Sequence, residues 1–235
     1  MKNLLIASTS TLHGSGYLTY LQEELPKLFK DGEALFIPFA RPNGISHDAY
    51  TQKAQEAFKD IGISLKGIHS FENPLEALRN AKGVFTGGGN TFLLVKQLYH
   101  HQLMEPLREM LHNGMPYLGT SAGSNICGLT MQTTNDMPIV YPPSFKTLGV
   151  LPFNINPHYL DPDPTSTHMG ETRETRIHEF HTQNNLPVVG LREGSWLRVQ
   201  NDTIQLCGKP TARIFEQGKS PYEIESGTQL DTYFT

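Results

Sequence analysis

The first half of the sequence alternates short apolar runs with longer amphipathic stretches. The apolar runs predict strands at residues 4–8, 33–39, 64–69, 83–86 and 116–119. The spacing of the apolar residues between them predicts helices at 17–30, 50–61, 74–80, 92–100 and 104–112. Because strands that alternate with helices form right-handed βαβ units, this half of the chain predicts an α/β fold with a mainly parallel sheet flanked by helices.

The second half of the sequence differs in proline content and in hydrophobic periodicity. Prolines become frequent after residue 130, and helical periodicity returns only in a short predicted helix at 171–181. An apolar run at 188–191 predicts another strand, and the sequence from Trp196 onward alternates in the manner of antiparallel strands. We see no repeat and no long linker, so residues 1–235 are expected to form a single catalytic domain.

Composition narrows the class of protein. The formal net charge is -4, and no block of Lys and Arg indicates a nucleic-acid partner. The apolar run at the start is too short for a signal-peptide core or a membrane helix. Cys127 and Cys207 lie far apart and match no metal-ligand spacing. We therefore expect a reduced cytoplasmic protein that binds neither membrane nor nucleic acid.

The segment Gly119-Thr120-Ser121-Ala122-Gly123 lies between a predicted strand and a predicted helix. Gly-x-Ser-x-Gly in this context is typical of a nucleophile elbow, in which small residues permit a tight turn that exposes the serine hydroxyl. The N–H of Ala122, beside the serine, is a candidate oxyanion donor. The same five residues could instead form an ordinary turn with Ser121 as a helix cap.

A nucleophilic serine needs a base, and the sequence offers ten histidines. We favour His158, because Pro157 makes the loop that carries it rigid. His168, His178 and His181 suggest a metal site instead, but the spacing of His178 and His181 is i, i+3 and no clear further ligand follows. No metal is expected.

The base in turn needs a carboxylate, and two acids compete for this role. Asp136 lies in a polar turn after the nucleophile segment, and Glu193 lies at the end of the predicted strand at 188–191. Spacing alone does not separate them. Asp136 could merely cap a turn, and Glu193 could pair with a nearby arginine.

The triple-glycine run at residues 87–89 follows the predicted strand at 83–86. It could cradle a phosphate, but it lacks the Lys-Ser/Thr of a P-loop and the spacing of a dinucleotide fingerprint. A second interpretation fits better: the loop donates a backbone N–H, from Gly89, to an oxyanion hole opposite Ala122.

Five segments of this sequence together resemble the peptidase E family, the α-aspartyl dipeptidase group of serine peptidases that is related to cyanophycinase. They are 87–91, 119–123, 133–140, 156–158 and 170–173. The resemblance implies a fold like the class I glutamine amidotransferases, with serine in place of their cysteine. It also implies hydrolysis of dipeptides with an N-terminal aspartate, without metal or cofactor. The family's nucleophile falls on Ser121 and its base on His158, while its acid falls on Asp136, which we favour, or on Glu193.

Recognition of an aspartate side chain calls for a cationic fork. Arg173 and Arg176 are the candidates, with Asn90 of the glycine loop as a further substrate contact. The acid that does not orient His158 could receive the substrate ammonium group. The expected partner is a small peptide, and the enzyme is expected to be a monomer or homodimer. Alternatives are a cyanophycinase-like hydrolase of a β-aspartyl-arginine polymer, a phosphate- or nucleotide-binding protein, and a non-enzymatic ligand-binding protein.

Overall fold

Seven strands form the main sheet of the computed structural model, which describes residues 1–163, 165, 167 and 169–234. Their order is β3-β2-β4-β5-β1-β8-β9, and the first five are mutually parallel. The strands are β1 (Asn3–Ala7), β2 (Glu33–Ile37), β3 (Ser64–Gly67), β4 (Val84–Thr86), β5 (Pro116–Thr120), β8 (Ser195–Gln200) and β9 (Thr203–Gly208). The prediction of a mainly parallel sheet with antiparallel strands toward the C-terminus is confirmed.

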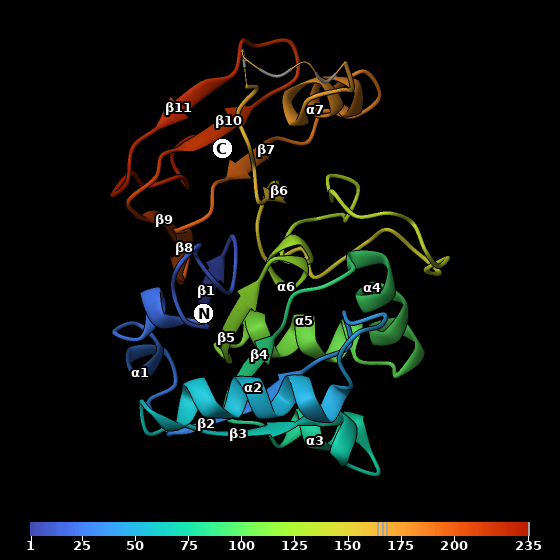
Figure 1. Cartoon of the computed structure of the whole chain (residues 1–235), viewed down its shortest axis with the longest axis vertical. Helices are drawn as coiled ribbons and strands as arrows, with labels where there is room; N and C mark the ends of the chain where they lie inside the picture. Colours follow the sequence, from blue (N-terminus) through green and yellow to red (C-terminus); the bar gives the residue numbers. More distant parts are fainter. Residues whose placement is uncertain (164, 166, 168, 235) are drawn as a thin grey trace.

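Helices cover both faces of this sheet (Figure 1). They are α1 (Leu25–Leu28), α2 (His47–Lys59), α3 (Pro74–Arg79), α4 (Thr91–His100) and α5 (Met104–His112), and the short α6 (Ala122–Asn125) follows β5. Side chains alternate across β1: Leu4 and Ile6 belong to the apolar cluster that includes α4 and α5, and Leu5 and Ala7 to the cluster that includes α1 and α2. This two-residue period is what a strand buried on both faces requires.

A second sheet of four strands has the order β11-β10-β7-β6. It consists of β6 (Asn154–Pro157), β7 (Val188–Leu191), β10 (Ala212–Phe215) and β11 (Tyr222–Ile224), and α7 (Arg173–His181) lies near it (Figure 1). Strands β6 and β7 are parallel, whereas β10 runs antiparallel to both of its neighbours. The largest apolar cluster contains residues of both sheets.

The predicted helix at 17–30 is wrong. The segment forms a 3-10 turn, η1 (Thr19–Leu21), and then the single-turn helix α1. Pro26 lacks an N–H and clashes with the preceding turn, so it is accommodated only in the first turn of a helix. Leu21, Leu25 and Leu28 are nevertheless buried, so the apolar spacing identified core residues without identifying a helix.

The remaining predicted elements occur. The helix at 104–112 and the strand at 188–191 have the predicted ends, and others have shifted ends. Helix α2 begins at His47 rather than near residue 50, because the Ser46 hydroxyl accepts a hydrogen bond from the N–H of Ala49 (3.1 Å) and caps the helix. The predicted strand at 64–69 ends at Gly67, where the chain enters the 3-10 turn η2 (Ile68–Ser70). Among the described residues, no helix is long and apolar enough to cross a membrane.

Candidate active site

Ser121 lies directly after β5, at the carboxyl edge of the main sheet, and begins α6. Its backbone has φ 54° and ψ -111°, a strained conformation for a residue with a side chain. The Ser121 N–H donates to the carbonyl of Ala7 at the end of β1 (3.2 Å). A Cβ at Gly123 would lie 2.2 Å from the carbonyl oxygen of Thr86. The turn therefore requires glycine there, as expected of a nucleophile elbow.

His158 brings Ser121 and Glu193 together. Its Nε2 lies 2.9 Å from Ser121 Oγ, and its Nδ1 lies 2.6 Å from Glu193 Oε1. The side chains of His158 and Glu193 are 35% and 45% exposed, so the pair faces solvent at the mouth of the site. Within the part of the chain that the structure describes, Glu193 pairs with His158 and with no arginine.

The backbone of His158 is held from several sides. Its φ is +54°, in the left-handed region that is costly for a residue with a side chain. The buried Ser8 hydroxyl accepts from the His158 N–H (2.9 Å) and donates to the carbonyl of Leu191 (2.7 Å). The amide of Asn135 donates to the Pro157 carbonyl (2.7 Å). These contacts join the ends of β1, β6 and β7, and they fix the imidazole above Ser121.

Asp136, the acid favoured on the sequence, contacts the start of α4. Its Oδ2 accepts hydrogen bonds from the N–H of Thr91 (2.7 Å) and from the Thr134 hydroxyl (3.0 Å). Thr91 is the first residue of α4, where a carboxylate is stabilised by the unpaired N–H groups of the helix. Within the described part of the chain no hydrogen bond joins Asp136 to His158, because Glu193 already occupies Nδ1.

Asn90 caps the same helix. Its Oδ1 accepts from the N–H of Leu93 (3.0 Å), and its Nδ2 donates to the carbonyl of Met137 (2.9 Å). Both ends of the side chain are therefore engaged within the protein. Together with Asp136, Asn90 ties the segment around Met137 to the start of α4.

The glycine loop packs against Ser121. A Cβ at Gly88 would lie 2.9 Å from the Cβ of Ser121. The N–H of Gly88 donates to the Tyr50 hydroxyl (2.9 Å). Gly89 has φ +147°, and a Cβ there would lie 2.2 Å from the carbonyl oxygen of Ala40. Across the described residues, the N–H groups of Gly89 and Ala122 donate no hydrogen bond to another protein group. Both are thus available to an oxyanion.

The two candidate arginines lie in different surroundings. Arg173 is half-buried at the start of α7. Burial, reinforced by Arg176, lowers the pKa of the Arg173 guanidinium, whereas the negative charge of Asp136 works to raise it, so Asp136 lies near this cation. Arg176 lies 3.7 Å from Glu171 and lines a separate hollow with Phe92 and Phe145. The structure therefore associates Arg173, but not Arg176, with the segment of Asp136.

Two residues that contact the site were not among the candidates. Ser8 carries a weak signal, since it is the polar residue that ends a predicted apolar strand at the carboxyl edge. Tyr50 carries none: it lies within α2, and only the tertiary fold brings its hydroxyl to Gly88.

The histidines that suggested a metal site are separate. His178 lies 3.8 Å from Glu174, and His181 Nε2 lies 3.0 Å from the carbonyl of Leu186. His168 lies outside the described residues. In the described part of the chain, no group of three or more His, Cys, Asp or Glu side chains is arranged to hold a metal ion.

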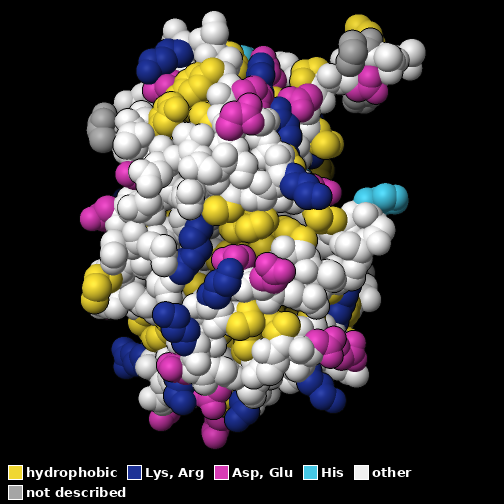
Figure 2. All heavy atoms as spheres, turned by 90° about the vertical axis from the view of Figure 1, so that its left-hand side faces the viewer, with side chains coloured by type: hydrophobic (Ala, Val, Ile, Leu, Met, Phe, Trp, Pro, Cys, Tyr) yellow, Lys and Arg dark blue, Asp and Glu magenta, His cyan; other side chains and the backbone are white. Residues whose placement is uncertain are grey.

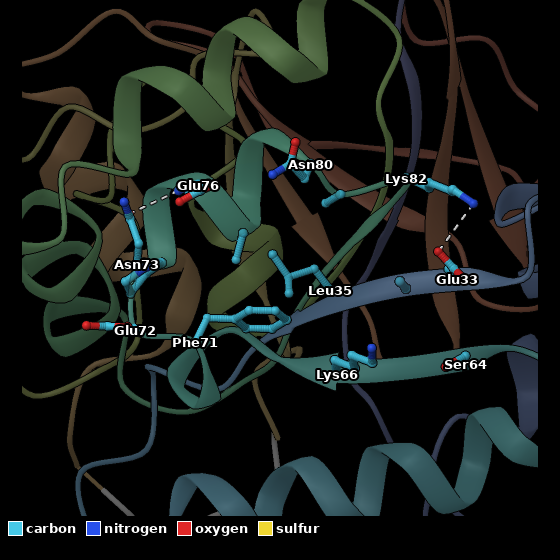
Figure 3. Close-up of a pocket in the computed structure, with 14 residues that line it drawn as sticks. Glu33, Leu35, Ser64, Lys66, Phe71, Glu72, Asn73, Glu76, Asn80 and Lys82 are labelled. Carbon is cyan, nitrogen blue, oxygen red and sulfur yellow. Dashed lines mark hydrogen bonds and ion pairs between the residues drawn. The ribbon is translucent and has the colours of Figure 1, made fainter.

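A hollow away from this site lies between the edge strand β3, its neighbour β2 and helix α3 (Figure 3). Glu33 and Lys82 form an ion pair across it (3.4 Å), and Phe71 and Leu35 line its floor. It contains none of the expected site residues.

On the face seen in Figure 2, acidic and basic side chains are interspersed, so this face carries no block of one sign of the kind that binds nucleic acid.

A serine that contacts a histidine, which in turn contacts a carboxylate, is the arrangement of serine hydrolases. Residues 4–207 match peptidase family S51. The chain is 49% identical to peptidase E of Streptomyces coelicolor (97% of this chain, 93% of that protein) and 46% identical to a probable alpha-aspartyl dipeptidase of Drosophila melanogaster (95% and 93%). The chain therefore belongs to peptidase family S51 and is a serine-type dipeptidase.

Solved structures agree on the fold. A peptidase from an acI-B1 Actinobacterium superposes with a TM-score of 0.72 over 97% of this chain and 96% of that chain, at 18% identity. A putative peptidase E from Listeria monocytogenes gives a TM-score of 0.63 over 96% and 98%, also at 18% identity. At these identities the likeness concerns the fold alone.

Proposed function

We propose that this peptidase hydrolyses dipeptides whose first residue is aspartate, with Ser121 as nucleophile, His158 as general base and Glu193 as the acid that orients His158. The observation that carries the proposal is the pair of contacts of 2.9 Å and 2.6 Å made by the two ring nitrogens of His158. A carboxylate at Nδ1 keeps the proton on that nitrogen and leaves the lone pair of Nε2 facing Ser121. The substrate class is suggested by the name of the Drosophila relative.

Each half of the reaction needs two proton transfers at Nε2. His158 takes the proton of Ser121 Oγ as the oxygen attacks the aspartyl carbonyl carbon, and Glu193 stabilises the imidazolium that forms. The imidazolium then gives this proton to the leaving amine as the peptide bond breaks, which leaves an aspartyl ester on Ser121. Water then attacks the ester carbonyl carbon while His158 takes a proton from it, and His158 returns this proton to Ser121 Oγ as the ester bond breaks. Free aspartate and the second amino acid are the products.

The negative charge of the tetrahedral intermediate needs donors that are already in place. In the proposal these are the N–H groups of Gly89, in the β4–α4 loop, and of Ala122, at the start of α6. The strained turn at Ser121 supports this, because it presents the N–H of Ala122 beside the nucleophile.

Recognition of aspartate is assigned to Asp136 and Arg173. Oδ2 of Asp136 is engaged by Thr91 and Thr134, while Oδ1 makes no hydrogen bond within the described residues, so Oδ1 can receive the substrate ammonium group. Arg173 makes no ion pair with a described side chain and can bind the aspartate carboxylate in a bidentate manner. Asn90 then acts indirectly, by holding the Asp136 segment against α4.

The proposal extends to a single catalytic domain over residues 1–235 that works as a monomer or homodimer on a small peptide. Its support is the apolar cluster shared by both sheets. Both Cys127 and Cys207 are free thiols, which fits the expected reducing, cytoplasmic compartment.

One experiment tests the function directly. Hydrolysis of Asp-Leu is compared with that of Glu-Leu, Ala-Leu and N-acetyl-Asp-Leu, for the wild type and for Ser121→Ala. We expect turnover of Asp-Leu alone, and its loss in Ser121→Ala. Undiminished hydrolysis by Ser121→Ala would overturn the mechanism, and equal rates on Ala-Leu would overturn the specificity.

A further inference from the structure

A network of five charged side chains lies beside the His158–Glu193 pair. Arg192, which directly precedes Glu193, is at its centre. The guanidinium binds Asp161 through Nε (2.9 Å) and Nη2 (2.7 Å), and it binds Glu223 through Nη1 (2.8 Å) and Nη2 (3.0 Å). Arg213 continues the network from Glu223 (3.1 Å) to Glu174 (2.9 Å).

Arg192 connects the two chain segments that carry the base and its acid. Asp161 follows His158 by three residues, and the Arg192 guanidinium also lies over the ring of Tyr159, 5.4 Å from the ring centroid. On its other side Arg192 is anchored to the second sheet, where Nη1 also donates to the hydroxyl (2.8 Å) and the carbonyl (3.1 Å) of Thr211. The side chain is only 18% exposed, so its planar fork is held in one orientation.

The network also decides which partner Glu193 takes. An arginine beside a carboxylate in sequence is a competing partner for it, yet both faces of the Arg192 fork are occupied by Asp161 and Glu223. Those bonds raise the pKa of Arg192, so its charge persists. Burial works to raise the pKa of Glu223, but hydrogen bonds from Arg192, Thr211 and Arg213 outweigh it and lower the pKa to about 2. Glu193 therefore pairs with His158 rather than with Arg192.

We infer that Arg192 is a positioning residue of the catalytic site: by binding Asp161 and Glu223 together, it holds the strained His158 loop against the end of β7 and keeps Glu193 on His158. Arg192 does not contact the reacting atoms. The inference rests on the proposed function, and it deepens that function by extending the site from three residues to the ion network behind them.

The test compares Arg192→Met and Asp161→Asn with Arg213→Met. Arg213 is a matched control, because it belongs to the same network and is similarly buried. It binds Glu174 and Glu223 but no described residue of the His158 loop. Because a misplacement of about 1 Å can cost about 100-fold in rate, we expect Arg192→Met to lower kcat by about 10- to 100-fold on Asp-Leu with KM little changed. Asp161→Asn should lower kcat less, and Arg213→Met should keep kcat within about twofold of the wild type.

Three further readouts separate positioning from general damage. The downfield proton resonance of the short His158–Glu193 contact should persist in Arg213→Met and be lost or broadened in Arg192→Met. Arg192→Lys should restore part of kcat. In the Arg192→Met/Asp161→Asn double variant, kcat should be no lower than in Arg192→Met alone, because both changes break one connection.

Unchanged kcat and an unchanged resonance in folded Arg192→Met would overturn the inference. The inference would also be overturned if Arg192→Met and Arg213→Met lost kcat equally and in proportion to their losses of thermal stability. The resonance and the labelling rate of Ser121 by a fluorophosphonate require no peptide. A failure of the aspartyl-dipeptidase assignment would therefore leave this test intact.

Discussion

Glu193 Oε1 lies 2.6 Å from His158 Nδ1, so the carboxylate that follows β7 reaches the imidazole that follows β6. The two strands are parallel neighbours, with Pro157 opposite Leu191 in register. Residues just beyond their carboxyl ends must therefore lie side by side. Asp136, the rival acid, belongs instead to the segment that caps α4.

The first prediction distinguishes the two acids. Glu193→Gln removes the charge that stabilises the imidazolium and disturbs the tautomer of His158, so kcat should fall by about 1,000- to 10,000-fold. Because Asp136 is the proposed partner of the substrate ammonium group, Asp136→Asn should raise KM while kcat stays within about tenfold. Steady-state kinetics on Asp-Leu measure both. The reverse pattern would return the orienting role to Asp136.

The second prediction concerns Arg173, the proposed partner of the substrate side chain. Arg173→Met should raise KM for Asp-Leu by about 10- to 100-fold, since a charge-assisted hydrogen bond contributes about 1.5–3 kcal/mol. It should also reduce the preference for Asp-Leu over Asn-Leu. Arg176→Met is the control, because Arg176 pairs with Glu171 beside another hollow. An equal effect of both changes would place the carboxylate site elsewhere.

Ser8 is the subject of the third prediction. Its buried hydroxyl joins the His158 N–H to the Leu191 carbonyl, which also accepts from the Tyr159 N–H (3.2 Å). Ser8→Ala therefore leaves the His158 N–H without its partner and should cost about 1–3 kcal/mol of unfolding free energy. Release of the strained His158 backbone should also lower kcat by about tenfold. Thr147→Val is the matched control, since the buried Thr147 hydroxyl donates to Gly128 (2.7 Å) away from the site. Urea unfolding and kcat are measured together; equal kcat in both variants would contradict the positioning role of Ser8.

A fourth prediction tests the oxyanion loop. In Gly89→Ala the new methyl group meets the carbonyl of Ala40, and the loop must shift. Because loss of one oxyanion donor costs about 100- to 1,000-fold in kcat, a fall of this size is expected. Gly44→Ala is the control: Gly44 also has a positive φ (+83°), but a Cβ there has nothing within 4 Å. It should cost about 1 kcal/mol of stability and leave kcat unchanged.

The fifth prediction follows from the lowered pKa of Glu223, which shifts from 4.5 to about 2 on folding. A carboxyl group whose pKa is lower in the folded state stabilises the protein fully above pH 4.5, and this contribution is lost as the pH falls toward 2. Since the side chain is about one-third exposed, solvent screening limits the contribution to about 1–2 kcal/mol.

Glu223→Gln removes the titrating carboxyl group. The free energy of unfolding of this variant should therefore fall less than that of the wild type as the pH is lowered. The measurement is the free energy of unfolding in urea between pH 6 and pH 3 for both proteins. Parallel curves over that window would show that Glu223 does not carry the effect.

The local sequence pattern was sufficient to predict an element where one type of interaction, such as close packing or burial, determines its residues. The elbow around Ser121 was recognisable because only small residues permit the close approach of Gly123 to Thr86. The strands of the parallel sheet were recognisable because continuous apolar runs are needed for burial on both faces. The segment at 17–30 misled, because the same leucine spacing serves a helix and an irregular buried segment alike, and Pro26 decided between them.

The sequence by itself determined the parallel α/β fold, the nucleophile turn and the choice of His158 as its partner. The tertiary structure decided which carboxylate reaches that histidine. Asp136 and Glu193 are both acids in polar turns, and chain spacing says nothing about which lies beside His158 in space. The pairing of β6 with β7 decides it, because parallel neighbours end at the same edge, and the Arg192 network then leaves Glu193 no competing cation.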